Sequence, residues 1–175
     1  KTNDITVLKR DLPSGAFNES LYYLKSLFLN PLTPITFSSY TRAKLKNEIS
    51  SAIKDKEYDI RLFDCLHLGA PFIVGNRLIK PLNVKKIIYR AHNLEADIWK
   101  KYVYEERNII KKLFLFYQSK LVFKWESIIA KASDGIAAIA NEDLKDLKAI
   151  SSKSKFKFVP LGLDFKSPLD YLSNS

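Results

Sequence analysis

A histidine follows directly after an apolar run and precedes a candidate helix, and this position suits it for chemistry. The run at residues 87–89 (Ile-Ile-Tyr) is typical of a β-strand, and the segment ends in His92. Asn93 is a candidate helix N-cap, with Glu95 in the first helical turn. Ligands bind beyond the carboxyl ends of strands in open parallel sheets, so His92 could donate a hydrogen bond or move a proton there. Alternatively, His92 bonds the backbone and only closes the strand.

The remaining histidine and the single cysteine are weaker candidates for a catalytic or ligand-binding role. His67 ends another strand-like pattern, where it would either line a cleft or pack as a structural residue. Neither histidine has metal-ligand spacing to a cysteine or carboxylate, so no metal site is expected. Cys65 cannot form an internal disulfide, which favours a reducing compartment, and we interpret it as a small buried hydrophobe.

Several common catalytic motifs are missing from the sequence. Its five glycines form neither a G-x-G-x-x-G fingerprint nor a P-loop. No H-E-x-x-H and no G-x-S-x-G occurs. The pattern therefore disfavours dinucleotide-binding enzymes, Walker-type NTPases, zinc hydrolases and serine hydrolases.

Length and composition indicate one folded domain that prefers anionic partners. The chain has 175 residues, of which 46% are hydrophobic and 27% charged, enough apolar surface for a core. Its formal net charge is +10, and the excess is spread along the chain. Phosphate esters, nucleic acid and acidic membrane surfaces all suit such a charge.

Short apolar runs alternate with helical patterns, which predicts an α/β fold with a Rossmann-like parallel sheet flanked by helices. Strands are expected at residues 5–8, 58–63, 85–91, 135–140 and 155–159, and helices at 18–29, 41–56 and from the candidate cap Asn141 onward. One helical pattern extends from Asn93 to Lys131. A single helix of that length would approach about 60 Å, so we expect a break near Arg107 and Asn108.

The helical region from 96 to 131 carries eight basic and four acidic residues, interleaved with aromatic residues. One interpretation is a surface for an anionic membrane, with lysines at the headgroups. Another is a solvated helix face over the core. Nucleic acid would use the same lysines, but no RNP, helix-turn-helix or zinc-finger pattern supports it. The candidate membrane-surface residues are Lys100, Lys101, Lys111, Lys112, Lys120 and Lys124.

Three segments together resemble family-four, GT-B-fold glycosyltransferases. The segment RAHNLEADIW at 90–99 resembles the strand-to-helix segment of that family. The segment DGIAAIANED at 134–143 resembles its D-x-hydrophobic-strand-S-x-x-D element, and FVPLGLD at 158–164 resembles its V-I-P-N-G-V-D. The resemblance covers residues 58–164, and the earlier part by layout only. Ala140 and Leu161 depart from it, because the family commonly has serine and asparagine there.

The resemblance implies one half of a GT-B fold. Residues 1–164 would form an incomplete N-terminal, acceptor-side Rossmann-like domain, and 165–175 would begin the interdomain linker. The sequence starts at Lys1 and holds no methionine, so we expect a fragment that lacks the first strand–helix unit. The family's C-terminal domain, with its paired glutamates, would also lie outside it, and the fragment alone would be inactive.

The implied enzyme transfers a sugar from a nucleotide-sugar donor to a glycan or lipid-linked acceptor, with retention of configuration. It needs no metal or cofactor, since the nucleotide sugar is a co-substrate. The resemblance assigns catalysis to His92 and substrate binding to Asn93, His67 and Glu95, in a cytoplasmic protein at the inner face of the plasma membrane. The alternative is a non-enzymatic basic α/β module that binds an anionic membrane or nucleic acid.

Overall fold

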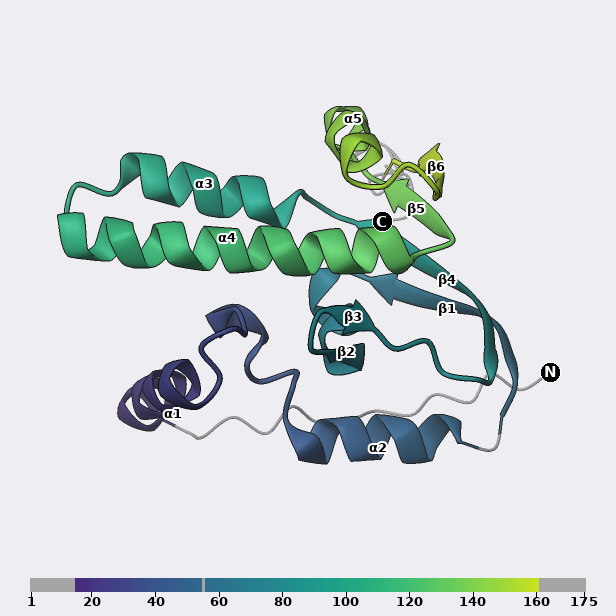
Figure 1. Ribbon diagram of the computed structural model, residues 1–175, viewed down its shortest axis with the longest axis horizontal. Helices are drawn as coiled ribbons and strands as arrows, with labels where there is room; N and C mark the ends of the chain where they lie inside the picture. The colour runs from purple at the N-terminus through teal and green to yellow at the C-terminus, as the bar shows by residue number, and fades with distance from the viewer. Residues whose placement is uncertain (1–14, 55, 161–175) are drawn as a thin grey trace, which may run out of the picture.

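The computed structural model describes residues 15–54 and 56–160, and a four-stranded parallel sheet forms its centre (Figure 1). The strand order is β1-β4-β5-β6, with bounds β1 Tyr58–Asp64, β4 Val84–Ala91, β5 Gly135–Ala138 and β6 Lys155–Phe158. The fold is therefore α/β with a Rossmann-like sheet, as predicted, and these four strands lie within two residues of their expected bounds. The strand expected at 5–8, the end of the FVPLGLD segment and the linker at 165–175 lie outside the described residues.

Helices flank the sheet, and a small hairpin lies beside it. The helices are α1 Ala16–Leu29, α2 Ala43–Ile53, α3 Glu95–Glu105, α4 Ile109–Ala132 and α5 Asn141–Ile150, with short 3₁₀ helices η1 Ile35–Phe37 and η2 Leu66–Phe72 and hairpin strands β2 Ile73–Val74 and β3 Arg77–Leu78. The predicted break between α3 and α4 is confirmed. There Asn108 caps α4, because its Oδ1 accepts hydrogen bonds from the backbone N–H groups of Ile110 and Lys111 at 3.0 and 3.1 Å.

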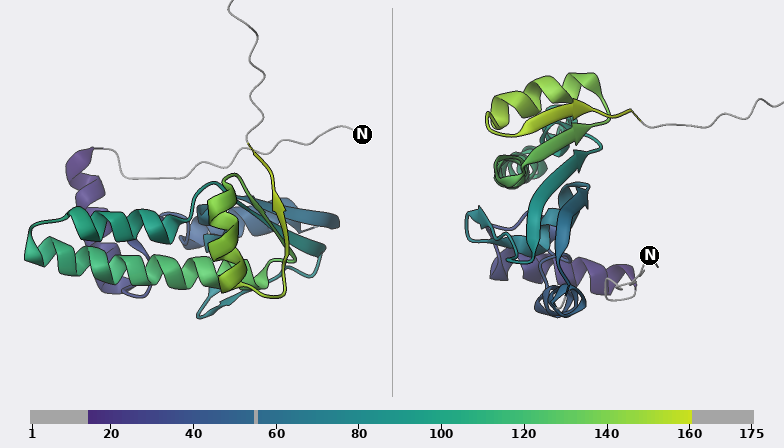
Figure 2. Two further views of the ribbon diagram at one scale, coloured as in Figure 1. Left: turned by 90° about the horizontal axis from the view of Figure 1, so that it is seen from above. Right: turned by 90° about the vertical axis from the view of Figure 1, so that its right-hand side faces the viewer.

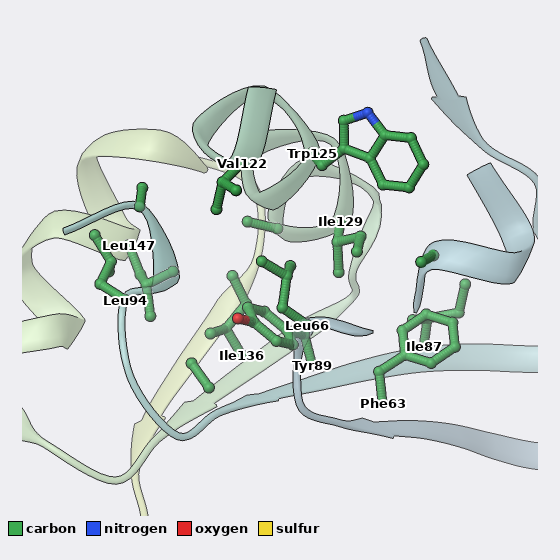
Figure 3. Packing of buried hydrophobic residues seen from close by; sticks show 14 of the residues in the cluster. Phe63, Leu66, Ile87, Tyr89, Leu94, Val122, Trp125, Ile129, Ile136 and Leu147 are labelled. Atoms are coloured by element: carbon green, nitrogen blue, oxygen red, sulfur yellow. The ribbon is translucent and has the colours of Figure 1, made fainter. Parts of the chain in front are cut away.

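The core lies between the sheet and the carboxyl half of α4 (Figure 3). Ile87, Tyr89 and Ala91 alternate along β4 with partly exposed residues, and all three are fully buried. Val122 and Ile129 of α4 are also fully buried. In α4 the first buried residue is Gln118, so the amino-terminal third of this helix extends past the core (Figures 1 and 2). None of the helices in the described residues is long and apolar enough to cross a membrane.

Asp134 opens the second segment of the glycosyltransferase resemblance, and its role in the structure is architectural. Its Oδ2 accepts a hydrogen bond from the backbone N–H of Ile87 at 2.8 Å. Its own N–H donates to the carbonyl oxygen of Ile87, also at 2.8 Å. Asp134 therefore joins the residue before β5 to the neighbouring strand β4.

The prediction that Asn141 caps the last described helix is wrong by one residue. Helix α5 begins at Asn141, and Ala140 occupies the cap position with an extended backbone of φ −102° and ψ 139°. No side chain caps this end. The side chain of alanine has no acceptor atom for the first N–H groups of the helix, so the stabilisation that a capping side chain provides is missing here.

Restoring an acceptor at this cap should stabilise the fold. We expect Ala140→Ser to raise the free energy of unfolding by about 1 kcal/mol, because its hydroxyl oxygen can accept from the N–H two or three residues on. The matched control is Ala149→Ser within the exposed last turn of α5, where serine should weaken the helix slightly. Urea unfolding of the three proteins measures both effects. Equal destabilisation by both substitutions would contradict the assigned cap.

Candidate functional site

The candidate site lies at the carboxyl ends of β1 and β4, where three charged or titratable side chains meet. The parallel register pairs Asp64, the last residue of β1, with Arg90 of β4. Nε2 of His92 lies 2.7 Å from Oδ1 of Asp64. Nη1 of Arg90 donates to the same oxygen at 3.1 Å. The position expected for His92 is thus confirmed, and it has a carboxylate partner.

The ionisation of Asp64 fixes the role of each nitrogen of His92. The hydrogen bond from His92 lowers the pKa of Asp64; burial opposes this shift, and the charge of Arg90 adds to it. An ionised carboxylate only accepts hydrogen bonds, so Nε2 of His92 carries the hydrogen. Nδ1 has no hydrogen-bond partner among the described residues, which leaves it available to a ligand.

This group is open to solvent. The exposed fractions of the side chains are 42% for His92, 43% for Asp64 and 27% for Arg90. A ligand can therefore reach the ring of His92 without rearrangement of the core. An ion pair this exposed adds little to the stability of the fold, which favours a role in binding or catalysis over one in folding.

The residue after Asp64 has a strained backbone. Cys65 has φ 130° and is the one non-glycine residue of the described segments with positive φ. Such a conformation costs about 1–3 kcal/mol, and strain of this kind clusters at functional sites. Cys65 is half-buried, so the prediction that it is a small buried hydrophobe is wrong as to its burial. Its backbone instead redirects the chain from β1 into η2.

The helix after His92 is anchored by a residue that the sequence reasoning only counted among the four acidic residues of 96–131. Glu126 of α4 is fully buried. Its Oε1 accepts from the backbone N–H of Glu95 at 3.2 Å, and its Oε2 from that of Ala96 at 3.1 Å. A carboxylate facing the first N–H groups of a helix compensates both their unpaired hydrogens and the helix dipole.

The prediction that Asn93 caps α3 is therefore wrong. Leu94 occupies the cap position, without a side-chain cap bond, because Glu126 already bonds the N–H groups that Asn93 would have reached. The side chain of Asn93 is exposed next to His92. Asn93 consequently stays a candidate for substrate contact.

Burial dominates the chemistry of the anchor. It raises the pKa of Glu126 from 4.5 to about 7, although the N–H groups of Ala96 and Glu95 act in the opposite direction. The charge of Glu95 raises it further, and burial also raises the pKa of Glu95. The hydroxyl of Tyr89 lies 3.4 Å from Oε1 of Glu126, and burial holds the pKa of this phenol well above its usual range. Glu95 therefore belongs to the anchor through its backbone and its charge.

His67 packs against aromatic rings. Its ring is half-buried and meets Phe37 edge-to-face, with centroids 4.6 Å apart at 89°. Tyr40 lies against it at 5.3 Å. These contacts join η2 to the segment around η1, in agreement with the packed alternative. They do not bring His67 to the pair formed by His92 and Asp64.

A separate cavity of about 650 Å³ lies between α1, α2, the β2–β3 turn and α4. Its lining is basic: Lys25, Arg42, Lys46 and Lys124 contribute, and no acidic residue of the described part of the chain does. Serine, threonine and asparagine side chains supply further hydrogen-bonding groups. This chemistry suits an anionic group such as a phosphate.

The sequence reasoning did not identify Asp64 or Glu126 as site residues, although the pattern around each residue indicates a role. Asp64 is the polar residue that ends an apolar strand, but its meeting with His92 depends on the pairing of β1 with β4. Glu126 stands at helical spacing from Val122 and Ile129 on an apolar stripe, where a carboxyl must find donors.

No family model, curated protein or solved structure matches this chain. Within the described residues no cluster of three or more His, Cys, Asp or Glu side chains could hold a metal ion. The sheet, the paired His92 and Asp64, and the motif around them therefore carry the functional argument.

The anchor should make stability depend on pH. A carboxyl with a raised folded-state pKa contributes most stability below about 4.5, and this contribution is lost as the pH rises through about 7. We expect the wild type to lose about 3 kcal/mol relative to Glu126→Gln between mildly acidic and mildly alkaline pH, since glutamine stays neutral.

Urea unfolding across this pH range measures the free energy of unfolding of the wild type and of Glu126→Gln. The contributions of the other titrating groups largely cancel in the difference between the two proteins. Glu142→Gln, at an exposed position of α5, is the control and should leave the slope of the wild type unchanged. Parallel pH profiles for wild type and Glu126→Gln would contradict the assigned anchor.

Proposed function

We propose that this chain forms the acceptor-side half of a glycosyltransferase with the GT-B fold. The observation that carries the proposal is the pair of His92 and Asp64 at the carboxyl edge of a parallel sheet, within the segment RAHNLEADIW. That edge is where open α/β sheets bind ligands. The resemblance of three ordered segments supplies the reaction class, and a Rossmann-like sheet is the architecture which that class requires.

In the proposed reaction the bond between the anomeric carbon of a nucleotide sugar and its phosphate oxygen breaks. A bond from an acceptor hydroxyl oxygen forms on the same face of the sugar, and the hydroxyl proton passes to the departing phosphate. Positive charge develops on the sugar and negative charge on the phosphate, so fixed donors and charges lower the barrier. No metal or cofactor is required besides the nucleotide-sugar co-substrate.

His92 would act as a hydrogen-bond donor at the reacting centre. Nε2 is held by Asp64, so the ring donates to a substrate through Nδ1 when both nitrogens carry hydrogen. The carboxylate of Asp64 offsets the positive charge of that ring and fixes its orientation. Asn93, exposed beside it, would contact the acceptor, while the donor nucleotide would bind mainly to a second domain.

The acceptor would be a glycan or a lipid-linked sugar. The basic cavity lined by Lys25, Arg42, Lys46 and Lys124 supports an acceptor that bears phosphate. Nucleotide sugars are cytoplasmic substrates, and a lipid-linked acceptor lies in a bilayer. We therefore propose a cytoplasmic location at the inner face of the plasma membrane.

The test uses the protein expressed from its complete open reading frame. It is incubated with a panel of nucleotide sugars and a membrane extract as acceptor source, and the release of nucleoside diphosphate is measured. We expect His92→Ala to lower kcat by about a hundredfold or more with folding intact, because it removes the donor at the reacting centre. Asp64→Asn should lower kcat by about tenfold, because it keeps the ring but loses the compensating charge.

The control is Asp59→Asn, which removes the other carboxylate of β1 that forms an ion pair, here with Lys85 at 2.6 Å. Its turnover should match the wild type. Near-normal turnover of His92→Ala would return His92 to a structural role. The absence of any nucleotide-sugar turnover by the wild type would argue against the transferase itself.

A further inference from the structure

The hairpin of α3 and α4 ends in an apolar tip that the fold does not use. We define the hairpin tip as residues 104–117, which comprise the end of α3, the turn and the first turns of α4. The exposed fractions of its side chains are high: Tyr104 86%, Ile109 71%, Ile110 75% and Leu113 65%. Contiguous exposure of large apolar side chains marks an interaction surface.

The position of the tip explains why no core covers it. The buried residues of α4 begin at Gln118, so residues 109–117 extend about 13 Å beyond the part that packs on the sheet. Figures 1 and 2 show both helices projecting past the sheet, with the turn at the far end of the molecule. Truncating these side chains therefore removes no core contact.

Basic residues surround the tip. Between residues 100 and 124 there are seven lysines and arginines but two acidic residues. Lys100, Lys112 and Lys120 line a cavity of about 540 Å³ together with Val103, Tyr104, Phe116 and Phe123. The Nζ atoms of Lys100 and Lys120 lie 5.9 and 5.2 Å from the ring centroids of Phe123 and Phe116. Lysines thus flank an apolar groove along the hairpin.

We propose that the hairpin tip docks on the surface of an anionic phospholipid bilayer. The aliphatic and aromatic side chains of the tip enter the boundary between headgroups and acyl chains, and the lysines meet lipid phosphates. The charge of the hairpin is complementary to an anionic surface. Ile109, Ile110 and Leu113 match the bilayer better than nucleic acid, because a phosphodiester backbone offers aliphatic side chains no apolar partner.

This inference adds a docking surface to the location given under the proposed function. It rests on the proposed function only in the identity of the membrane, the inner face of the plasma membrane. Bilayer docking would hold a bound acceptor lipid and the His92 edge at one membrane surface. Vesicle binding needs neither donor nor acceptor, however. Its outcome is therefore separate from the outcome of the turnover assay.

The experiment is vesicle co-sedimentation with the protein from the complete open reading frame. The vesicles contain phosphatidylcholine either alone or mixed with phosphatidylglycerol. We expect the wild type to bind the mixed vesicles at least tenfold more strongly, and the binding to fall as salt rises from about 0.1 M to about 1 M. Ile110→Ser/Leu113→Ser, which removes apolar area from the tip, and Lys111→Gln/Lys112→Gln, which removes two charges, should each weaken binding about tenfold.

Two matched controls test whether position matters. Ile79→Ser/Leu82→Ser removes exposed apolar side chains between β3 and β4, and Lys145→Gln/Lys148→Gln removes exposed charges from α5. Both should bind the mixed vesicles like the wild type. Circular dichroism and the thermal midpoint should be the same for all variants, since every substituted side chain lies outside the core.

Three outcomes would overturn the inference. One is no binding to mixed vesicles, and another is equal weakening by the control variants and the tip variants. The third is self-association, seen by light scattering, that Ile110→Ser/Leu113→Ser abolishes while vesicle binding persists. That result would assign the tip to a second copy of the chain.

Discussion

The structure depends on one buried carboxyl group. Glu126 lies fully inside the protein and accepts hydrogen bonds from the first two N–H groups of α3, next to the hydroxyl of Tyr89 in β4. A buried acid is costly unless donors surround it, and the start of a helix supplies donors together with a favourable dipole. This interaction fixes where α3 begins, and hence the path of the short segment that carries His92.

The site combines this rigid support with an open edge. The support is buried and contains Glu126, Tyr89 and the backbone of α3. The edge is exposed, and there His92 and Arg90 share one oxygen of Asp64, directly before the strained backbone of Cys65. A rigid, buried support fixes the orientation of the exposed pair, as a binding or catalytic site requires. The same helix that provides Glu126 extends past the sheet to form the hairpin tip.

The sequence predicted the elements better than their junctions. Strands β1, β4, β5 and β6 follow from β-rich runs, and the break before Asn108 follows from helix length. Both cap predictions failed: α5 starts one residue too early for Asn141 to be its cap, and a side chain from another helix replaces Asn93. A cap that comes from a distant helix, as Glu126 does for α3, leaves no pattern in the sequence near the start of the helix that it caps. His92 was found because it follows a strand directly, whereas Asp64 became visible only through the register of two parallel strands.

The most direct test of this account is an NMR titration of the carboxyl carbon of Glu126, together with the backbone amides of Glu95 and Ala96. We expect a midpoint near 7 for Glu126, and amide shifts that follow the same midpoint because both N–H groups donate to this carboxyl. A midpoint near the ordinary 4.5, with amides that do not respond, would show that Glu126 is solvated and does not hold the start of α3.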